Sequence, residues 1–298
     1  MPEHRQERAA SAASAASAAS AASAVPAVAR EPQYMDRHPD RQPDYAQSVE
    51  YRKGTSRGAA RLPHGFVLEP HSHTRGQLVY AASGALATAT ARGTWVAPAN
   101  RVTWTPPRFA HSHRFYGETD VRLLTVPLDL CGQLVDHPSV FAVSPLLREA
   151  LLALTGGKER RPGAHGRLLA VLVDELADAA EQSLHLPEAS DDRLRTVTAL
   201  LHEDPARPAT LAALGRTVGA SERTLSRLFH AELGMSFHRW RTTLRIHHAL
   251  AHLAAGLSVT DTAVVCGWSN PSTFIDAFTE MVGQTPGRYR AGLRGARS

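Results

Sequence analysis

A pattern of helix, short turn and second helix occurs twice in the last third of the chain, and it limits the possible folds more than any other feature. In the first copy, Thr210 and Ser221 are helix-capping residues, and Gly219 between them predicts the turn. The second helix should cover residues 222–232, with apolar positions at i, i+3 and i+4 that are Leu225, Leu228 and Phe229. Its opposite, polar face carries Arg223, Ser226, Arg227 and His230. A basic polar face on the second helix of such a pair is typical of a helix-turn-helix unit.

The same pattern returns after a long helix that is predicted over residues 236–254. Residues 259–267 predict another first helix and turn, and residues 270–282 predict another second helix with Phe274 and Phe278 at i and i+4. The long helix of about 18 residues would span about 27 Å. A rigid spacer of that length can hold two reading helices near one turn of DNA, about 34 Å, apart.

Positive charge is concentrated in this same region. The whole chain of 298 residues has a formal net charge of +5 and a pI near 9.6. Residues 207–298 alone contain eleven Arg, no Lys and five acidic residues, a net charge of +6, so the rest of the chain is almost neutral. This distribution favours a polyanion as the partner of the C-terminal third only.

Length and composition exclude several other classes of protein. A chain of this length is expected to form about two domains. Two cysteines far apart in the sequence, Cys131 and Cys266, exclude a disulfide scaffold and fit a reducing cytoplasm. Because there is no run of about 18 apolar residues, we expect no membrane-spanning helix and no membrane partner.

A set of motifs spread over residues 190–291 points to one family. They are Leu211-Ala-Ala-Leu214, Ala220–Phe229, Glu232–Phe237, Arg245, Ala249, Gly267-Trp268, Phe274, Phe278 and Gly283–Arg290. Together these motifs resemble the AraC/XylS family of transcription regulators. The resemblance implies two helix-turn-helix units that bind successive major grooves on one face of double-stranded promoter DNA.

The resemblance also implies roles for individual residues. The first reading helix would contact base edges through Arg223, Ser226 and Arg227, and an Arg side chain suits the O6 and N7 atoms of guanine. The outward positions of the second unit are Pro271, Ser272, Ile275 and Asp276. Of these, Ser272 is the candidate base contact. Because an aspartate that faces phosphate or guanine is unfavourable, we expect the first unit to supply most of the specificity. Five further arginines are candidates for phosphate contacts, which fix the register on DNA and make binding depend on salt: Arg239, Arg241, Arg245, Arg288 and Arg290.

The region before the helices has a β pattern. Between residues 60 and 127, short apolar stretches are interrupted by glycine and proline every 8–12 residues or so, which is typical of an all-β sandwich or barrel. One set of residues is spaced like the first motif of cupin barrels, where a glutamate usually stands in place of Gln77: Gly65, His71, His73, Gln77 and Gly84. The segment 106–111 resembles the second cupin motif, with Arg108 in place of a glycine. The fold is therefore expected to be multi-domain, with an N-terminal all-β cupin-like barrel and then an all-α domain with two helix-turn-helix units.

The histidines of the barrel form a candidate metal site. His71, His73, Gln77 and His111 are the predicted ligands of a divalent transition metal such as Zn, Ni, Cu or Fe. His71 and His73 are two residues apart, so on a strand they point to the same face. Since Gln77 replaces an anionic ligand, two alternatives stay open: a polar lining for an organic effector, and ordinary hydrogen-bonded structural histidines.

An effector pocket is expected beside these histidines, and no certain cofactor follows from the sequence. Trp95, Trp104 and His113 are assigned to the wall of this pocket, although aromatic residues of a sheet more often belong to its core.

The expected order of domains follows from these patterns. A tail over residues 1–54, rich in Ala-Ala-Ser repeats and proline, is expected to be disordered. The sensor barrel should cover 55–130, a helical connector 131–189 and the DNA-binding domain 190–298. Connector helices predicted at 144–154 and 165–185 would either form a homodimer interface or pack on their own barrel.

Taken together, these features predict a ligand-responsive transcription regulator and not an enzyme. The barrel would sense a small molecule or a metal, and binding would alter promoter affinity or contact with RNA polymerase. One alternative is a cupin metalloenzyme, an oxygenase or isomerase, fused to a DNA-binding module, for which Glu69 is the only carboxylate close in sequence. The other alternative is a constitutive DNA binder with a structural β domain.

Overall fold

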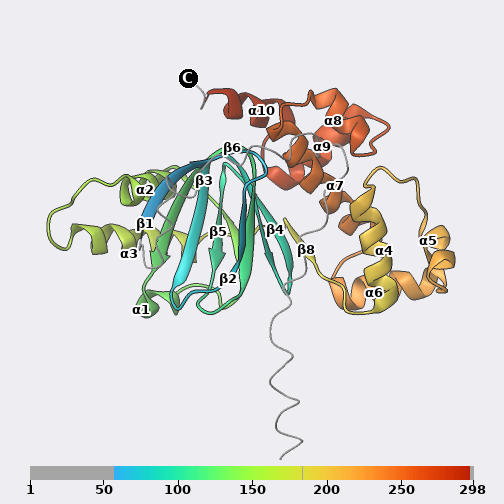
Figure 1. Cartoon of the computed structure of the whole chain (residues 1–298), viewed down its shortest axis with the longest axis horizontal. Coiled ribbons are helices and arrows are strands. Elements are labelled where there is room, and N and C mark those ends of the chain that lie inside the picture. The colour runs from blue at the N-terminus through green and yellow to red at the C-terminus, as the bar shows by residue number, and fades with distance from the viewer. Residues whose placement is uncertain (1–56, 183, 296–298) are drawn as a thin grey trace, which may run out of the picture.

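The computed structural model describes residues 57–182 and 184–295, in which a β domain is followed by an array of helices (Figure 1). The tail predicted over residues 1–54 lies outside the described residues. The order of the elements confirms the fold class expected from the sequence, because an all-β domain comes first and two helix-turn-helix units follow it. Within the described ranges, no helix combines the length and apolar character needed to cross a membrane.

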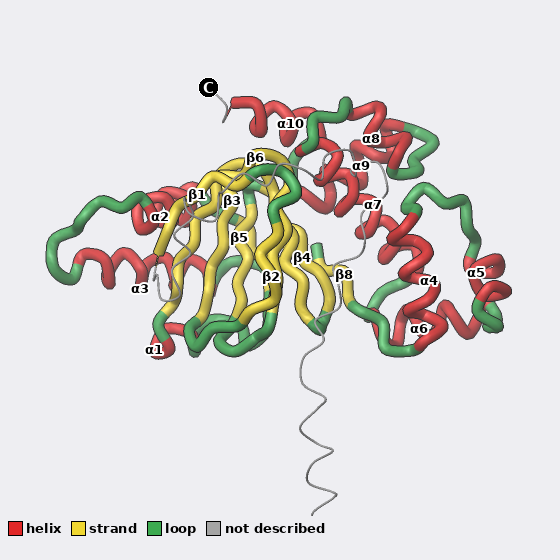
Figure 2. The backbone as a smooth tube through the Cα atoms, viewed as in Figure 1, coloured by secondary structure: helices red, strands yellow, loops and turns green. Residues whose placement is uncertain are grey.

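All strands that the structure describes belong to one antiparallel sheet. They are β1 (Arg57–Leu62), β2 (Val67–His71), β3 (Gly76–Thr90), β4 (Gly93–Pro98), β5 (Arg101–Thr105), β6 (His111–Val126), β7 (Ser139–Ala142) and β8 (His185–Pro187). The two long strands, β3 and β6, pair with each other along most of their length. β3 pairs with β5 in its first half and with β4 in its second, while β6 pairs with β2 at its start and with β1 at its end. The sheet therefore has two halves, which β3 and β6 connect (Figure 2).

A glycine allows β3 to pass from one half of the sheet to the other. The pairing of β3 with β6 shifts register on both sides of Ser83. Next to it, Gly84 has a φ of 80°, which side chains other than glycine rarely adopt. A Cβ atom at this position would lie 2.5 Å from Oγ1 of Thr119 on β6. The bend therefore requires glycine for both its backbone conformation and its close approach to β6.

The interior of the β domain has an apolar part and a polar part. Its apolar core contains Leu62, Val79, Ala81, Leu86, Trp95, Ala97, Phe115, Val121, Leu123 and Val140. Side chains alternate between the two faces of a strand, so Gln77 shares a face with Val79, and His113 shares a face with Phe115. Both polar side chains are almost completely buried. Gln77 and His113 therefore lie in the interior of the β domain, next to its apolar core, and not on its outer surface.

Two helices cover the outer face of the half that contains β5 and β7. α1 (Leu128–Cys131) leads to them, and they are α2 (Pro145–Thr155) and α3 (Ala164–Ala177) (Figure 1). Leu147 and Leu172 pack there against Leu78 and Trp104 of the sheet. The connector helices therefore pack on their own β domain, which was one of the two alternatives. A homodimer through their outer faces stays a prediction.

The segment predicted as a helical connector, 131–189, also contributes two strands to the sheet. β7 pairs with β5, and β8 pairs with β4. Both strands are very short, and each lies at an edge of the sheet. Their conformation depends on pairing with distant residues, so local periodicity could not reveal them.

The C-terminal helices agree closely with the pattern in the sequence. They are α4 (Asp192–Glu203), α5 (Leu211–Thr217), α6 (Glu222–Leu233), α7 (Phe237–Ala254), α8 (Val259–Val265), α9 (Pro271–Val282) and α10 (Pro286–Gly295). The predicted caps are confirmed, because Oγ1 of Thr210 accepts the Ala213 amide and Oγ of Ser221 accepts the Thr224 amide. Gly219, in the predicted turn, has a φ of 67°. These elements form because capping and apolar spacing are local properties.

The two helix-turn-helix units have different relations to the β domain. The core of the first unit is built around Leu225, Phe229 and Trp240, and among its buried members only Leu186 comes from a strand. The core of the second unit is shared with the outer face of the sheet, where Ala87 and Val96 join the helices. The second unit is therefore attached to the β domain through a common apolar core.

Candidate functional site

The first reading helix, α6, presents two arginines on its outer face. Leu225 and Phe229 are fully buried, while Arg223 and Arg227 are exposed and Ser226 is half-buried. Because Arg223 and Arg227 are four residues apart, their side chains lie next to each other on the helix surface. The guanidinium groups can therefore reach neighbouring base pairs in a major groove.

The second reading helix, α9, has an outer face without arginine or lysine. Ser272 and Asp276 are exposed, whereas Ile275 is half-buried and packs on the core of the second unit. Asn270 caps the helix by accepting the Ser272 amide at 2.8 Å. The exposed side chains of both helices are accessible to DNA. That the first unit supplies most of the specificity stays a prediction.

Arg241 and Arg245, two of the arginines that are predicted to contact phosphate, donate hydrogen bonds to neighbouring backbone carbonyl groups. Arg241 donates to the carbonyl oxygens of Arg207 and of Ala209, the latter at 3.0 Å. Arg245 donates from Nε to the Pro205 carbonyl oxygen at 3.0 Å, and its guanidinium lies 5.5 Å from the centre of the Trp268 ring. Burial lowers the pKa of Arg245 to about 10.

These contacts join the loop after α4 to both helix-turn-helix units. A Cβ atom at Gly267 would lie 2.6 Å from Cα of Ala206 and 2.8 Å from the Arg245 guanidinium. The loop therefore packs closely against the turn of the second unit, and Arg245 lies between them. The geometry favours a role for Arg241 and Arg245 in fixing the relative position of the two units.

The other three arginines of the predicted phosphate set differ in accessibility. Arg288 is exposed. Arg239 forms an exposed ion pair with Glu280 at 3.4 Å, and Arg290 donates to the Gly256 carbonyl oxygen at 3.2 Å. Among the five candidates, Arg288 has the geometry that fits a phosphate contact best.

Salt dependence separates these two kinds of arginine. We expect Arg288→Ala to reduce the slope of log affinity against log salt concentration by about one, because one phosphate contact is lost. Arg245→Ala should weaken binding about tenfold and leave the slope unchanged, because it loosens the junction between units. Fluorescence anisotropy of a labelled duplex between 50 and 200 mM salt measures both quantities. A smaller slope for Arg245→Ala would show that Arg245 contacts phosphate.

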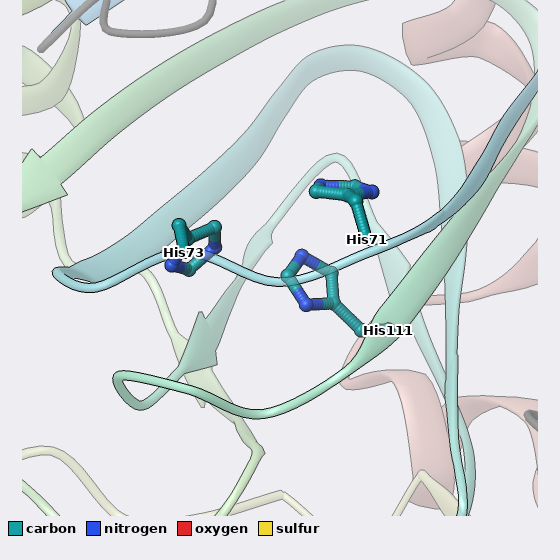
Figure 3. Close-up of side chains that lie close together, drawn as sticks. All are labelled: His71, His73 and His111. Atoms are coloured by element: carbon teal, nitrogen blue, oxygen red, sulfur yellow. The ribbon is translucent and has the colours of Figure 1, made fainter. Parts of the chain in front are cut away.

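Three of the predicted metal ligands come together in the β domain. His71 lies at the end of β2, His73 in the loop that follows and His111 at the start of β6 (Figure 3). Their candidate ligand atoms all lie within 4.8 Å of one another, and they form the only such cluster in the described part of the chain. Nitrogens bound to one tetrahedral metal are about 3.4 Å apart. Small side-chain rotations would therefore bring these ligands into place.

Hydrogen bonds to the backbone determine which nitrogen of each ring is available. Nδ1 of His71 lies 2.8 Å from the Glu69 carbonyl oxygen, Nδ1 of His73 lies 2.5 Å from that of Arg75, and Nδ1 of His111 lies 2.9 Å from that of Phe109. A carbonyl oxygen can only accept, so each Nδ1 carries the proton. Each neutral ring then has its lone pair on Nε2. This is the usual arrangement of metal-binding histidines, whose second nitrogen donates to a carbonyl or carboxylate group.

Gln77 and His113 complete the polar end of the interior. The Gln77 amide lies 3.1 Å from Nε2 of His111 and 3.4 Å from Nε2 of His113, while Nδ1 of His113 lies 2.9 Å from Oγ1 of Thr88. Since Nε2 of His111 is an acceptor, the amide must turn its NH2 group towards it when no metal is bound. Burial, together with the neighbouring histidines, lowers the pKa of His111 to about 3 and that of His113 well below its usual value. Both rings are therefore neutral, as metal ligands must be.

The donor set fits a divalent transition metal. Nε2 of His73 is buried beside Gln77, and burial lowers the pKa of His73 despite hydrogen bonds to Gln77 and to the backbone, so a neutral ring faces the interior. Three neutral imidazoles suit Zn, Ni, Cu or Fe and leave one coordination position for Gln77, water or an effector.

The structure separates the three residues predicted to line the effector pocket. Trp95 belongs to the interior core and stacks on His185, and His113 lies in the same interior. Trp104, in contrast, faces the opposite side of the sheet, where it packs under α2 and α3 and donates to the Val135 carbonyl oxygen at 2.9 Å. It therefore cannot line a pocket with the other two. The relative register of β4 and β5, which places the two tryptophans on opposite faces, is not visible in the sequence.

Sequence reasoning missed two residues that link the β domain to the second reading helix. Asn100 and Arg101, at the turn between β4 and β5, donate hydrogen bonds to the last carbonyl of α9. The available signal was an arginine at the start of the apolar stretch 101–104, and the structure shows that its side chain is buried, which is rare for arginine without a specific partner. Its partner is 181 residues away and could not be inferred.

Comparison with known proteins finds relatives among transcriptional regulators. A helix-turn-helix domain family model matches residues 214–292. The HTH-type transcriptional regulator NimR of Escherichia coli is 32% identical over 232 residues, which cover 75% of this chain and 82% of NimR. The HTH-type transcriptional regulator GlxA of Rhizobium meliloti is 36% identical over 85 residues, which cover 28% of this chain and 26% of GlxA. Among solved structures, ToxT of Vibrio cholerae is similar with 12% identity and a TM-score of 0.36, over 80% of this chain and 98% of ToxT.

The similarity to NimR extends beyond the matched domain into the β region, and it covers most of both chains. The two helix-turn-helix units, their capped helices and the exposed arginines of α6 agree with that similarity. The chain therefore belongs to the AraC-type family of helix-turn-helix transcriptional regulators.

Proposed function

We propose that this regulator binds promoter DNA through α6 and α9, and that a divalent transition metal held by His71, His73 and His111 controls this binding. The observation that carries the metal proposal is that all three histidines hold Nδ1 against a backbone carbonyl group. This arrangement leaves a lone pair on Nε2 of each ring, and one ring nitrogen of each histidine lies within 4.8 Å of the others. Structural histidines need no such common orientation.

The metal would either be the effector itself or anchor a small molecule at the remaining coordination position. When bound, it supplies an electrophilic centre for such a ligand. The chain's own residues orient the site, because the three carbonyl groups hold the rings and Gln77 can turn its amide. An interior lined by Thr88, His113 and Trp95 would surround the bound group.

Catalysis by this centre has less support than sensing. A metalloenzyme of the oxygenase or isomerase type needs an acid or base beside the open coordination position. Glu69 contacts His71 through its backbone carbonyl, and its side chain is exposed. We therefore keep regulation as the proposed role of the barrel. The protein would act in the cytoplasm, contact RNA polymerase at its promoters and bind DNA as a monomer or homodimer.

Metal analysis tests this proposal directly. Protein stripped with a chelator and dialysed against Zn, Ni, Cu or Fe should retain about one metal ion per chain. Affinity for a duplex selected from a random pool should then change at least tenfold. His111→Ala should lower metal affinity at least tenfold, because a ligand is lost. His137→Ala, a change at an exposed histidine far from this site in sequence, is the matched control.

Each part of the proposal can fail separately. A stripped protein that binds none of the four metals would overturn the metal as effector, and a thermal-shift screen of organic ligands would then test the alternative. Failure to select any duplex at low salt with heparin as competitor would contradict the DNA-binding role itself.

A further inference from the structure

The C-terminal end of the second reading helix is held by the β domain. The carbonyl oxygen of Val282, the last residue of α9, accepts one hydrogen bond from Nδ2 of Asn100 and one from the Arg101 guanidinium, both at 3.1 Å. Carbonyl groups in the last turn of a helix have no partner within the helix. We call Asn100 and Arg101 the α9 clamp, because they supply partners for one of these groups.

Arg101 is placed for this contact rather than for solvent. It is only 7% exposed, and its guanidinium also donates to the Asn100 carbonyl oxygen at 3.0 Å and to Oε1 of Gln182 at 3.2 Å. All these partners are neutral oxygen atoms. A positive charge is stabilised near the negative end of a helix dipole, so the C-terminus of α9 is a favourable site for the buried guanidinium.

The residue after α9 makes room for the clamp. Gly283 has a φ of 78° and ends the helix in the left-handed conformation. A Cβ atom at this position would lie 3.0 Å from the Arg101 guanidinium. Glycine therefore serves both the helix end and the close approach of Arg101.

The opposite end of α9 is open for DNA. Pro271, Ser272 and Thr273 in its first turn are all exposed. A reading helix contacts base edges mainly through its N-terminal residues. The β domain thus holds α9 at the end that does not enter the groove, and the shared core around Phe278 and Val282 supports the same attachment.

We propose that Asn100 and Arg101 are positioning residues for DNA reading, which set the orientation in which α9 meets the second half-site. The β domain then takes part in sequence recognition without touching DNA. Arg101 begins β5, and the far end of β5 pairs Thr105 with Gln77 and leads through residues 106–110 to His111. If the proposed metal site is correct, β5 connects it to the α9 clamp within eleven residues of sequence.

Two duplexes test the positioning role without any metal. One carries the complete site selected by the wild-type protein, and in the other the half-site that footprinting assigns to α9 is scrambled. We expect Asn100→Ala and Arg101→Gln to bind the complete site about tenfold more weakly than the wild-type protein does. On the scrambled site, both variants should have the same affinity as the wild type. Arg101→Lys should recover most of the loss, because it keeps a donor and the charge. Gln182→Ala is the matched control, since it removes a partner of Arg101 and leaves both donors to Val282.

Melting temperatures of all variants distinguish the positioning role from a loss of folding. If Arg101→Gln does not fold, Asn100→Ala still tests the proposal, because it removes only one hydrogen bond to Val282. Equal losses on the two duplexes, or no loss on either, would overturn the proposal. A wild-type protein that does not distinguish the two duplexes would also overturn it.

Zinc tests the connection to the metal site with the same duplexes. If zinc changes wild-type affinity for the complete site, Asn100→Ala should reduce that change severalfold while zinc still binds. An unreduced change would overturn the connection through β5. Absence of any zinc effect on the wild type would overturn zinc as the effector and its connection to the α9 clamp. The positioning role would then be decided by the metal-free comparison of the two duplexes.

Discussion

Acidification from pH 7 to pH 5 is expected to lower the free energy of unfolding by at least about 2 kcal/mol, because buried histidines of α7 stay neutral in the folded protein. Burial lowers the pKa of His247 to about 3 and outweighs its hydrogen bond to the Leu184 carbonyl oxygen. Burial and neighbouring histidines also lower the pKa of His248 to about 3, and burial lowers that of His202 to about 4. The His247 ring is hydrogen-bonded to the segment just before β8, and the His202 ring packs edge-on against Trp240 of the first unit.

The direction follows from the protons bound in each state. Above pH 6.5, the ordinary histidine pKa, His247 is neutral in both states and contributes no pH dependence. As the pH falls from 6.5 towards 3, the unfolded chain gains a proton that folded His247 does not. Stability then decreases by about 1.4 kcal/mol per pH unit for one such histidine, and the loss levels off below the folded pKa.

Urea unfolding at pH 7, 6 and 5 measures this loss. In His247→Gln, the free energy of unfolding should fall less steeply with decreasing pH, by the contribution of about one proton, about 1.4 kcal/mol per pH unit. This difference separates the contribution of His247 from those of the other buried histidines. His238→Gln, at an exposed position on the same helix, is the matched control. Identical pH slopes for wild type and His247→Gln would contradict the prediction.

Arg227→Ala is expected to weaken binding to the selected duplex by about 1–3 kcal/mol, roughly 5- to 150-fold, because a bidentate contact to guanine is lost. Arg227 is exposed on the outer face of α6 beside Arg223, so its guanidinium is accessible to a base edge. Ser272→Ala on α9 should cost much less, because one neutral hydroxyl contributes less than a charged bidentate donor.

Anisotropy titrations of both variants at one salt concentration, with the same duplex, test this difference. Discrimination against a changed base pair under α6 should also become weaker in Arg227→Ala. Equal losses for the two variants would contradict the expected asymmetry between the units.

Much of the candidate DNA-binding surface could be predicted from sequence because its signals are local. Ser221 caps α6, Leu225 and Phe229 repeat with the helical period, and Arg227 is then forced to the opposite face. The sequence also named His71, His73 and His111, which the structure brings together, although His73 lies in the loop after β2 and not on a strand beside His71.

Side chains that reach across the fold were not predictable in this way. Arg241 and Arg245 donate to carbonyl groups after α4, which the sequence did not reveal, and their contact with phosphate stays a prediction. Trp104 was predicted to line the effector pocket with Trp95 and His113, but the pairing of β5 with β3 places it under the connector helices.

The sequence by itself determined the kind of protein: a β domain with clustered histidines, followed by two helix-turn-helix units of which the first carries the exposed arginines. Only the tertiary structure decided which backbone carbonyl groups orient the histidines, and that Asn100 and Arg101 hold the end of α9. The physical reason is the range of the interactions. Caps and apolar periodicity act within a few residues, whereas the partners of a buried polar side chain depend on how distant segments pack.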